Sequence, residues 1–296
     1  MESYSTIYPV LAAFFFGSQY VPQKRLGKIN TRNYNNTMTF GIFFTAISFF
    51  LMNLIIETPK MNIVPVLLAF SSGLIWQGSN ILSITGINRI GMSKTSCLLN
   101  LISVFSFIFG ITIYSEEINI FKIIGLGITV VGAIIVATTQ KDETEKFDLK
   151  GVIYVLCAAF IISIFNVISI DSMVSKYHPT ISYYSSVLMM SIGAIIGGFI
   201  FNFRPKNLRI WMSEGKKFHL SALTGGFIWG CGILLTSYTL ANFGLSFGVP
   251  IIQAVMIIIS TFWGIVYFKE ITKKTAIIKF LVGVIISIIG IIFFNL

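Results

Sequence analysis

The amino-acid sequence predicts an all-α integral membrane protein of ten transmembrane helices, built as two five-helix halves that cross the membrane in opposite orientations. Three observations lead to this prediction: the composition, ten apolar runs of membrane-spanning length, and a repeat between the halves. Of the 296 residues, 55% are hydrophobic and 11% are charged. That leaves too little polar surface to cover a water-soluble globule, so the lipid bilayer is an expected partner of the chain.

Ten apolar runs follow one another along the chain, and polar or charged residues bound each of them. A hydrocarbon core of about 30 Å needs about 20 residues of helix, so ten spans and their connections fit the chain length. The runs lie near residues 5–22, 38–56, 63–87, 93–114, 120–139, 151–170, 181–203, 218–241, 246–268 and 275–295.

A charged window, KDETEKFDLK at 141–150, separates the fifth run from the sixth. Such a segment is typical of a connection rather than of a buried element. The sequence therefore predicts a first repeat over residues 1–140, a linker over 141–150 and a second repeat over 151–296.

Lysine and arginine gather in alternate connections, and basic connections are retained in the cytoplasm. Only Lys60, Lys122 and Lys176 lie in the opposite set of connections, which predicts a plasma-membrane protein with both termini on the non-cytoplasmic side. Because the basic residues occupy short gaps between apolar runs, the net charge of +10 does not indicate nucleic-acid binding. The basic set comprises Lys24, Arg25, Lys28, Arg32, Arg89, Lys94, Lys141, Lys146, Lys150, Arg204, Lys206, Arg209, Lys216, Lys217, Lys269, Lys273 and Lys274.

The two halves resemble each other in sequence. The segment that starts at Gly73 matches the one that starts at Gly226 without a gap for 46 residues, at a constant separation of 153, and pairs Trp76 with Trp229. Because each half has five helices, an odd number, the second half must enter the membrane upside down. Inverted repeats are typical of secondary transporters, whose solute site lies near the midplane between the halves.

The inverted repeat, together with a glutamate that ends the fourth helix of each half at Glu117 and Glu270, resembles the drug/metabolite transporter superfamily and its EamA-like members over the whole chain. FFGSQYVPQK at 15–24 resembles the GS-x-aromatic-VP-x-K pattern of the sugar-uptake branch, which includes glucose/ribose porters, rhamnose transporters, ureide permeases and relatives of transmembrane protein 144. GLIWQGSN at 73–80 resembles that branch's G-x-x-W-x-x-G-N pattern, although Ser79 interrupts it. The resemblance implies cation-coupled uptake of a sugar such as glucose, ribose or rhamnose.

Polar side chains inside a span are costly unless they face other helices, a cavity or water, so they are candidates for solute binding. Amides match the hydroxyls of a sugar without burying a net charge. Asn100 and Gln253 are equivalent in the repeat and are expected to flank a central site, while Trp76 and Trp229 are expected to stack on a sugar ring. The predicted substrate-binding residues are Ser18, Gln19, Trp76, Gln77, Asn80, Asn100, Asn166, Trp229 and Gln253.

Each of these residues also has a structural interpretation. Any single amide is equally consistent with a bond to a neighbouring helix, and the tryptophans with an interfacial belt or packing. Glu117 and Glu270 lie at helix ends, which favours capping over proton carriage. No Asp or Glu lies clearly within a span, so the choice of coupling ion, a proton or sodium, stays open.

The favoured function is secondary active transport of a small neutral polar metabolite, a sugar, by alternating access. One alternative is a carrier or exporter of nucleobases, ureides or other metabolites, and another is a membrane scaffold or sensor that transports nothing. An enzyme is not expected, because His178 and His219 fall in separate connections and Cys97, Cys157 and Cys231 are single. Neither a catalytic nor a metal constellation appears, and no cofactor is predicted.

Overall fold

The computed structural model describes residues 7–55, 58–59, 61–115, 118–139, 147–202 and 205–293. Within these ranges the chain is helical, with turns between the helices and no strand, as predicted. In chain order the elements are α1 (Ile7–Ser18), α2 (Val21–Arg25), α3 (Thr31–Leu54), α4 (Ile63–Ile90), α5 (Met92–Leu99), α6 (Ile102–Tyr114), α7 (Ile120–Ala137), α8 (Leu149–Met173), α9 (Tyr183–Phe201), α10 (Pro205–Ser213), α11 (Lys216–Phe243), α12 (Leu245–Thr261), the π-helix η1 (Phe262–Tyr267) and α13 (Lys274–Phe293).

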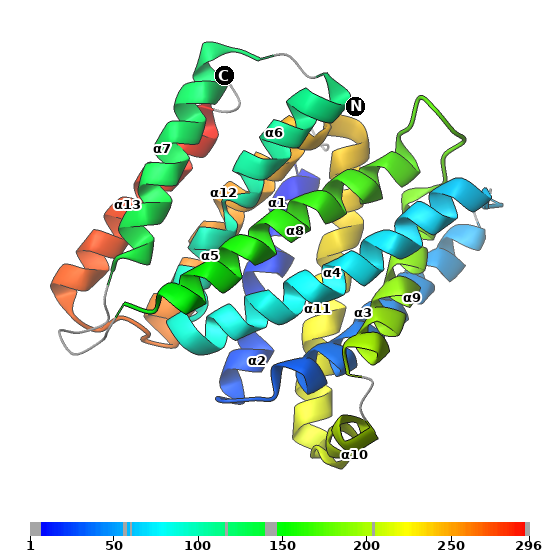
Figure 1. Ribbon diagram of the computed structural model, residues 1–296, viewed down its shortest axis with the longest axis horizontal. Coiled ribbons are helices and arrows are strands. Elements are labelled where there is room, and N and C mark those ends of the chain that lie inside the picture. The colour runs from blue at the N-terminus through cyan, green and yellow to red at the C-terminus, as the bar shows by residue number, and fades with distance from the viewer. Residues whose placement is uncertain are drawn as a thin grey trace.

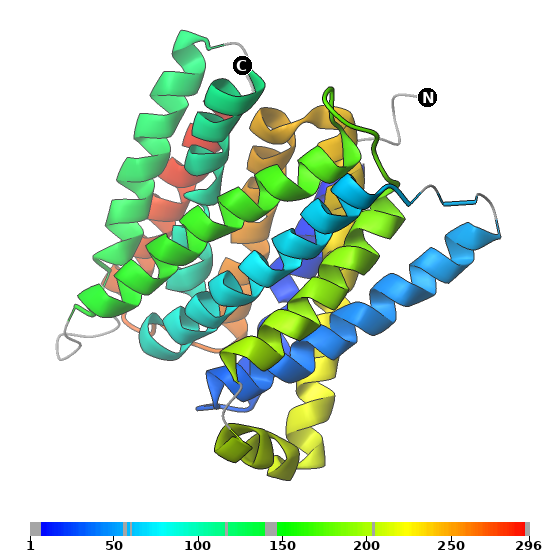
Figure 2. The same ribbon diagram turned by 45° about the vertical axis from the view of Figure 1, so that its right-hand side comes forward.

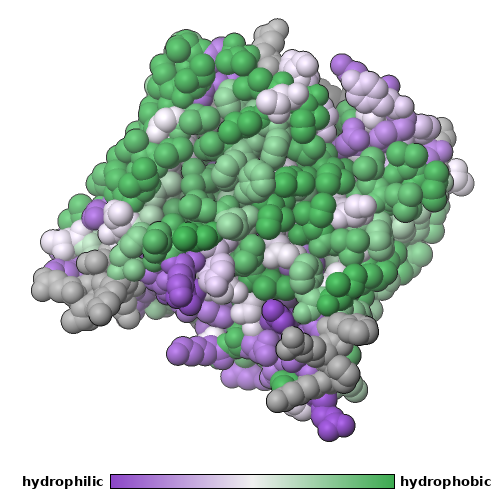
Figure 3. Space-filling model, in the orientation of Figure 1, coloured by the Kyte–Doolittle hydropathy of each residue, from purple (hydrophilic) through white to green (hydrophobic). Residues whose placement is uncertain are grey.

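Eight helical segments of the described chain are long and apolar enough to cross a membrane. Of the other two predicted runs, α1 has 12 residues, and α4 has 28 residues but carries polar side chains such as Gln77 and Asn80. Figure 3 shows a broad hydrophobic face over α4, α6, α7 and α8, and hydrophilic residues at the lower end near α2 and α10. The all-helical membrane class is confirmed, and the count of ten spans stays a prediction. The eight segments are Thr31–Leu54, Met92–Tyr114, Ile120–Ala137, Leu149–Met173, Tyr183–Phe201, Lys216–Phe243, Gly248–Tyr267 and Lys274–Phe293.

The helices pack in matching pairs. The helix α4 lies along α8 and α9, and α11 lies along α1 and α3 (Figures 1 and 2). At one edge of the molecule α7 packs against α13, and on the opposite side α3 packs against α9. Under the predicted repeat the neighbours of α4 correspond to the neighbours of α11, so the same packing occurs twice.

Glycines permit the closest of these contacts. A β-carbon added at Gly73 in α4 would collide with the carbonyl oxygen of Met190 in α9, and one added at Gly226 in α11 would collide with that of Met38 in α3. Small residues let membrane helices approach backbone to backbone. These paired contacts support a twofold relation between the halves, and they place α3 and α9 in register at a separation of 152 residues.

Two of the predicted spans are interrupted. In the first run, α1 ends at Ser18, and Gln19 and Tyr20 form a turn. The helix α2 then begins with Pro22 in its first turn, where a missing N–H costs nothing. The fourth run breaks at Asn100, whose backbone N–H donates to the carbonyl of Cys97, three residues back, at 3.2 Å. This tighter turn changes the direction in which the following side chains point.

The start of α3 differs most from the prediction. The helix begins at Thr31, seven residues before the predicted run at 38, and Asn30 caps it by accepting from the backbone N–H groups of Arg32 and Asn33. Its polar first turns are buried: Asn33 and Asn35 are 1% and 0% exposed. Hydropathy assigned these asparagines to a connection because it cannot register hydrogen-bond partners on other helices.

Candidate functional site

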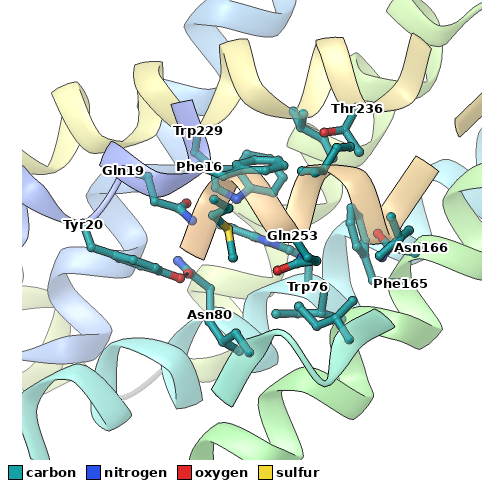
Figure 4. Close-up of a pocket in the computed structure, with 17 residues that line it drawn as sticks. Phe16, Gln19, Tyr20, Trp76, Asn80, Phe165, Asn166, Trp229, Thr236 and Gln253 are labelled. Atoms are coloured by element: carbon teal, nitrogen blue, oxygen red, sulfur yellow. Dashed lines mark hydrogen bonds between the residues drawn. The ribbon is translucent and has the colours of Figure 1, made fainter. Parts of the chain in front are cut away.

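A cavity lies where α1, α4, α8, α11 and α12 meet, and its labelled side chains converge from these helices in Figure 4. About 620 Å³ of space there is free of protein atoms, a volume that includes open solvent at the mouth of the cavity. None of its lining residues carries a formal charge. They are Phe16, Gln19, Tyr20, Trp76, Asn80, Leu99, Ile102, Ile162, Phe165, Asn166, Trp229, Ile233, Thr236, Val249, Ile252, Gln253 and Met256.

Two tryptophans from different halves meet at the cavity. The ring centroids of Trp76 and Trp229 lie 4.4 Å apart at an interplanar angle of 48°, and Phe16 lies 5.9 Å from Trp229. Both indoles are almost fully buried, at 3% and 4% exposure. Both residues line the cavity and so give it an aromatic, apolar surface.

Three residues that line the cavity each carry a buried side-chain oxygen with no hydrogen-bond partner among the described residues: Oε1 of Gln19, Oγ1 of Thr236 and Oε1 of Gln253. The side chains are 6%, 6% and 7% exposed. Buried polar atoms are normally hydrogen-bonded, since leaving one unpaired costs about 1–3 kcal/mol. The cavity is therefore suited to a neutral ligand that donates hydrogen bonds.

The cavity is lined by equivalent positions of the two predicted repeats. Six lining residues of the first half have repeat partners that also line it. The alignment of Ala12-Ala13-Phe14 with Ala158-Ala159-Phe160 sets the first three pairs, and the separation of 153 sets the others. The pairs are Phe16 with Ile162, Gln19 with Phe165, Tyr20 with Asn166, Trp76 with Trp229, Asn80 with Ile233, and Leu99 with Ile252.

The family model of sugar transport proteins matches residues 9–296. The chain belongs to the sugar transport protein family. It is 25% identical to a probable glucose uptake protein GlcU of Priestia megaterium, over 95% of each chain, and 24% identical to the glucose uptake protein GlcU of Bacillus subtilis (strain 168), over 97% of this chain and 96% of the relative. A putative sugar uptake protein of Listeria monocytogenes is 25% identical over 84% and 86%.

The fold of this family member is shared by a solved crystal structure, which superposes with a TM-score of 0.68 over 98% of each chain at 12% sequence identity. Family membership and the apolar helices together make the chain a multi-pass membrane protein of a transporter family. The assignment to the wider drug/metabolite transporter superfamily stays a prediction.

Six of the nine predicted site residues line the cavity: Gln19, Trp76, Asn80, Asn166, Trp229 and Gln253. The other three lie elsewhere. Ser18 accepts a hydrogen bond from the indole of Trp263 at 3.0 Å, and Gln77 faces Gly197 and Gly198 of α9. Asn100 is fully buried outside the lining, with both amide atoms unpartnered among the described residues, because the helix break after Leu99 turns it away.

Hydropathy and amide content missed two polar residues of the cavity. The Tyr20 hydroxyl donates to Oδ1 of Asn80 at 3.2 Å, and Thr236 is the last residue of α11 that lines the cavity. The repeat carried a signal for Tyr20, since its partner Asn166 was predicted. Thr236 had no such signal, because its partner, Ser83, does not line the cavity.

A charged cluster holds the two halves together at the end of the molecule near α2. The Glu270 carboxylate accepts from the backbone N–H groups of Met92 and Ser93 at 2.7 and 2.8 Å, from the Ser93 hydroxyl at 2.7 Å, and from Lys24 Nζ at 2.7 Å. It thereby caps the start of α5, after Gly91 with a φ of +88°. The structure agrees with the capping interpretation of Glu270, while Glu117 lies outside the described residues.

The electrostatics of this cluster favour an ionised carboxylate. Burial by itself raises the pKa of Glu270, but the charge and hydrogen bond of Lys24 and the two backbone N–H groups outweigh it and hold the pKa below its usual value. Each histidine has a side-chain partner on another segment. His178 pairs with Asp171 at 3.2 Å in a connection, and His219, expected in a connection, lies in the first turn of α11 beside Thr37.

Proposed function

We propose that the chain is a secondary active transporter that carries a small neutral polar solute, a sugar, by alternating access at the cavity between its two halves. The observation that carries the proposal is the cavity's chemistry: no charged lining residue, a tryptophan pair, and three unpartnered acceptor oxygens. A monosaccharide offers an apolar ring face to the indoles and several hydroxyl donors to the acceptors. The names of the relatives point to the same class of solute.

The packing supports alternating access between two five-helix repeats. Glu270 of the second half holds Lys24 and the start of α5, both from the first half, so rocking of the halves at this end must break these bonds. At the opposite end Ile170 occupies the repeat position of Lys24 and lines a separate surface pocket with Tyr114 and Leu240. Opening of the α2 end therefore depends on the Glu270 contacts, whereas Lys24 has no charged counterpart at Ile170.

The orientation is part of the proposal. In Figure 1, α1 begins and α13 ends at the end opposite α2, and three basic residues, Lys24 of α2, Arg89 and Lys269, line one pocket. We infer that the protein lies in the cell membrane with the α2 end facing the cytoplasm and both termini facing outward. Labelling of a cysteine placed at Lys28 by an impermeant maleimide, only after the cell membrane is opened, is the expected result. Labelling in intact cells would reverse the orientation.

Uptake into proteoliposomes tests the function. Radiolabelled D-glucose, ribose and rhamnose are supplied with an imposed proton gradient, a sodium gradient or neither, and saturable uptake of at least one sugar is expected. Gln253→Leu is expected to weaken it, whereas Leu281→Ala, on an exposed position of α13, serves as a matched control and leaves it unchanged. Absence of uptake and of exchange for all three sugars contradicts the proposal.

The same vesicles separate the alternatives. Competition by uracil or allantoin at lower concentration than any sugar would identify a carrier of nucleobases or ureides, since amides bind such solutes equally well. A non-transporting scaffold predicts that Asn100→Ala combined with Gln253→Ala changes thermal stability while no flux exists to change. The first result would replace the sugar as the proposed solute, and the second would contradict transport itself.

A further inference from the structure

Asn35 of α3 does not line the cavity, yet a continuous chain of buried hydrogen bonds joins it to a residue that does. We propose that Asn35 is a positioning residue that determines solute specificity: acting through Asn80, it fixes the Tyr20 hydroxyl as a hydrogen-bond acceptor toward the solute. The inference rests on the proposed function, because it concerns which hydrogen bonds a transported sugar must supply.

The chain of hydrogen bonds starts at a backbone carbonyl, which can act only as an acceptor. Asn35 Nδ2 lies 3.2 Å from the backbone carbonyl of Gln77, and a carbonyl only accepts. The atom of Asn35 that faces Gln77 must therefore be the amide nitrogen. Its oxygen Oδ1 is left to face Asn80, 2.5 Å from that residue's Nδ2, so the orientation of both amides follows from one backbone group.

The orientation of the Asn80 amide in turn determines the hydrogen bond of Tyr20, which lines the cavity. With its nitrogen committed to Asn35, Asn80 presents Oδ1 to the Tyr20 hydroxyl at 3.2 Å. A phenolic hydroxyl has a single proton, and that of Tyr20 is given to Asn80. Tyr20 therefore has no proton left to donate to a solute, and its oxygen can only accept.

Burial keeps this arrangement fixed. Asn35, Asn80 and Tyr20 are 0%, 2% and 4% exposed, so water does not compete for their bonds, and reversing one amide would leave two buried groups mispaired. The second half has no equivalent pair of amides, since Val187 and Ile233 occupy the repeat positions of Asn35 and Asn80. The acceptor at Tyr20 adds to those of Gln19, Thr236 and Gln253, and a solute hydroxyl beside it must donate.

The experiment compares D-glucose with its monofluorinated analogues, each with one hydroxyl replaced by fluorine, which accepts weakly and cannot donate. In proteoliposomes of the wild-type protein, at least one analogue is expected to show a KM about tenfold above that of glucose, the equivalent of one hydrogen bond. In Asn35→Leu that ratio is expected to fall to within about twofold of one, because the freed Asn80 amide can turn and let Tyr20 donate. Tyr20→Phe is expected to remove the discrimination as well.

The control is Asn33→Leu, two residues earlier on α3, where the buried amide bonds Glu214 and Asn202 instead. It is expected to keep the wild-type ratio, as is Asn35→Asp, whose buried carboxyl is neutral and retains one donor and one acceptor. If Asn35→Leu does not fold, Asn35→Ser takes its place. Three outcomes overturn the inference while glucose uptake persists. They are an unchanged KM ratio in the folded Asn35 variant, an equal loss of discrimination in Asn33→Leu, and no discrimination between glucose and its analogues by the wild type. Absence of any glucose uptake overturns the proposed function with it.

Discussion

The two halves contribute different chemistry to the cavity from equivalent positions. The first half places Gln19 and Asn80 where the second half places Phe165 and Ile233. In the fourth helix the difference is reversed: Gln253 lines the cavity on the continuous helix α12, and its partner Asn100 is turned away at the break between α5 and α6. Under the predicted repeat, equivalent positions thus carry an asymmetric set of polar groups, which can hold a solute in one orientation.

The tryptophan pair is the part of the cavity to which the two halves contribute equally, and its removal is expected to have the largest effect. Trp76→Ala or Trp229→Ala removes a ring that is at least 96% buried and is expected to destabilise the protein by about 3–5 kcal/mol. Thermal unfolding in detergent measures the loss. Because the rings pack on each other at 4.4 Å, the double variant should lose less than the sum of the two single losses, and strict additivity would show that they are not coupled.

Glu270 is a second asymmetric feature, and its contribution to stability is expected to depend on pH. Its folded pKa lies below the usual value of 4.5, so the stabilisation is present above about pH 4.5 and is lost as the pH falls through the folded pKa. Glu270→Gln is expected to cost about 2–3 kcal/mol at pH 7 and to flatten the change in melting temperature between pH 7 and pH 4. Asp148→Asn, at the exposed Arg89 pair, serves as the control with a smaller loss, and equal losses would contradict the assignment.

Gln253 and Asn100 give the sharpest comparison between the halves, with the smallest expected energy. Gln253→Leu removes an acceptor that faces the solute and is expected to raise the KM for the transported sugar about tenfold, the equivalent of one hydrogen bond. Asn100→Leu is expected to leave the KM unchanged and to keep or raise the melting temperature, because it replaces a buried amide that has no partner in the described part of the chain. Equal effects on KM would show that Asn100 reaches the solute after all.

The sequence by itself determined the class of fold and the centre of the site. Composition and apolar runs predicted a helical membrane protein because lipid must cover the surface that water cannot, and the structure and the family confirm that class. The match of Trp76 with Trp229 identified two residues that meet at the cavity, since equivalent residues of a twofold repeat face each other where they lie close to its axis. The number of spans and the inverted repeat remain predictions that the paired packing of α4 and α11 supports.

Only the tertiary structure decided which amides face the cavity and which serve other helices. The local sequence of Asn100 gives no sign that its helix breaks there, and Gln77 differs from Asn80 only in its direction around α4. The buried asparagines of α3 read as a polar connection because their partners, the Gln77 carbonyl and the Asn80 amide, come from a distant segment. Hydropathy measures the cost of placing a polar group in lipid, but the partner that removes this cost is set by packing, which the order of residues does not display.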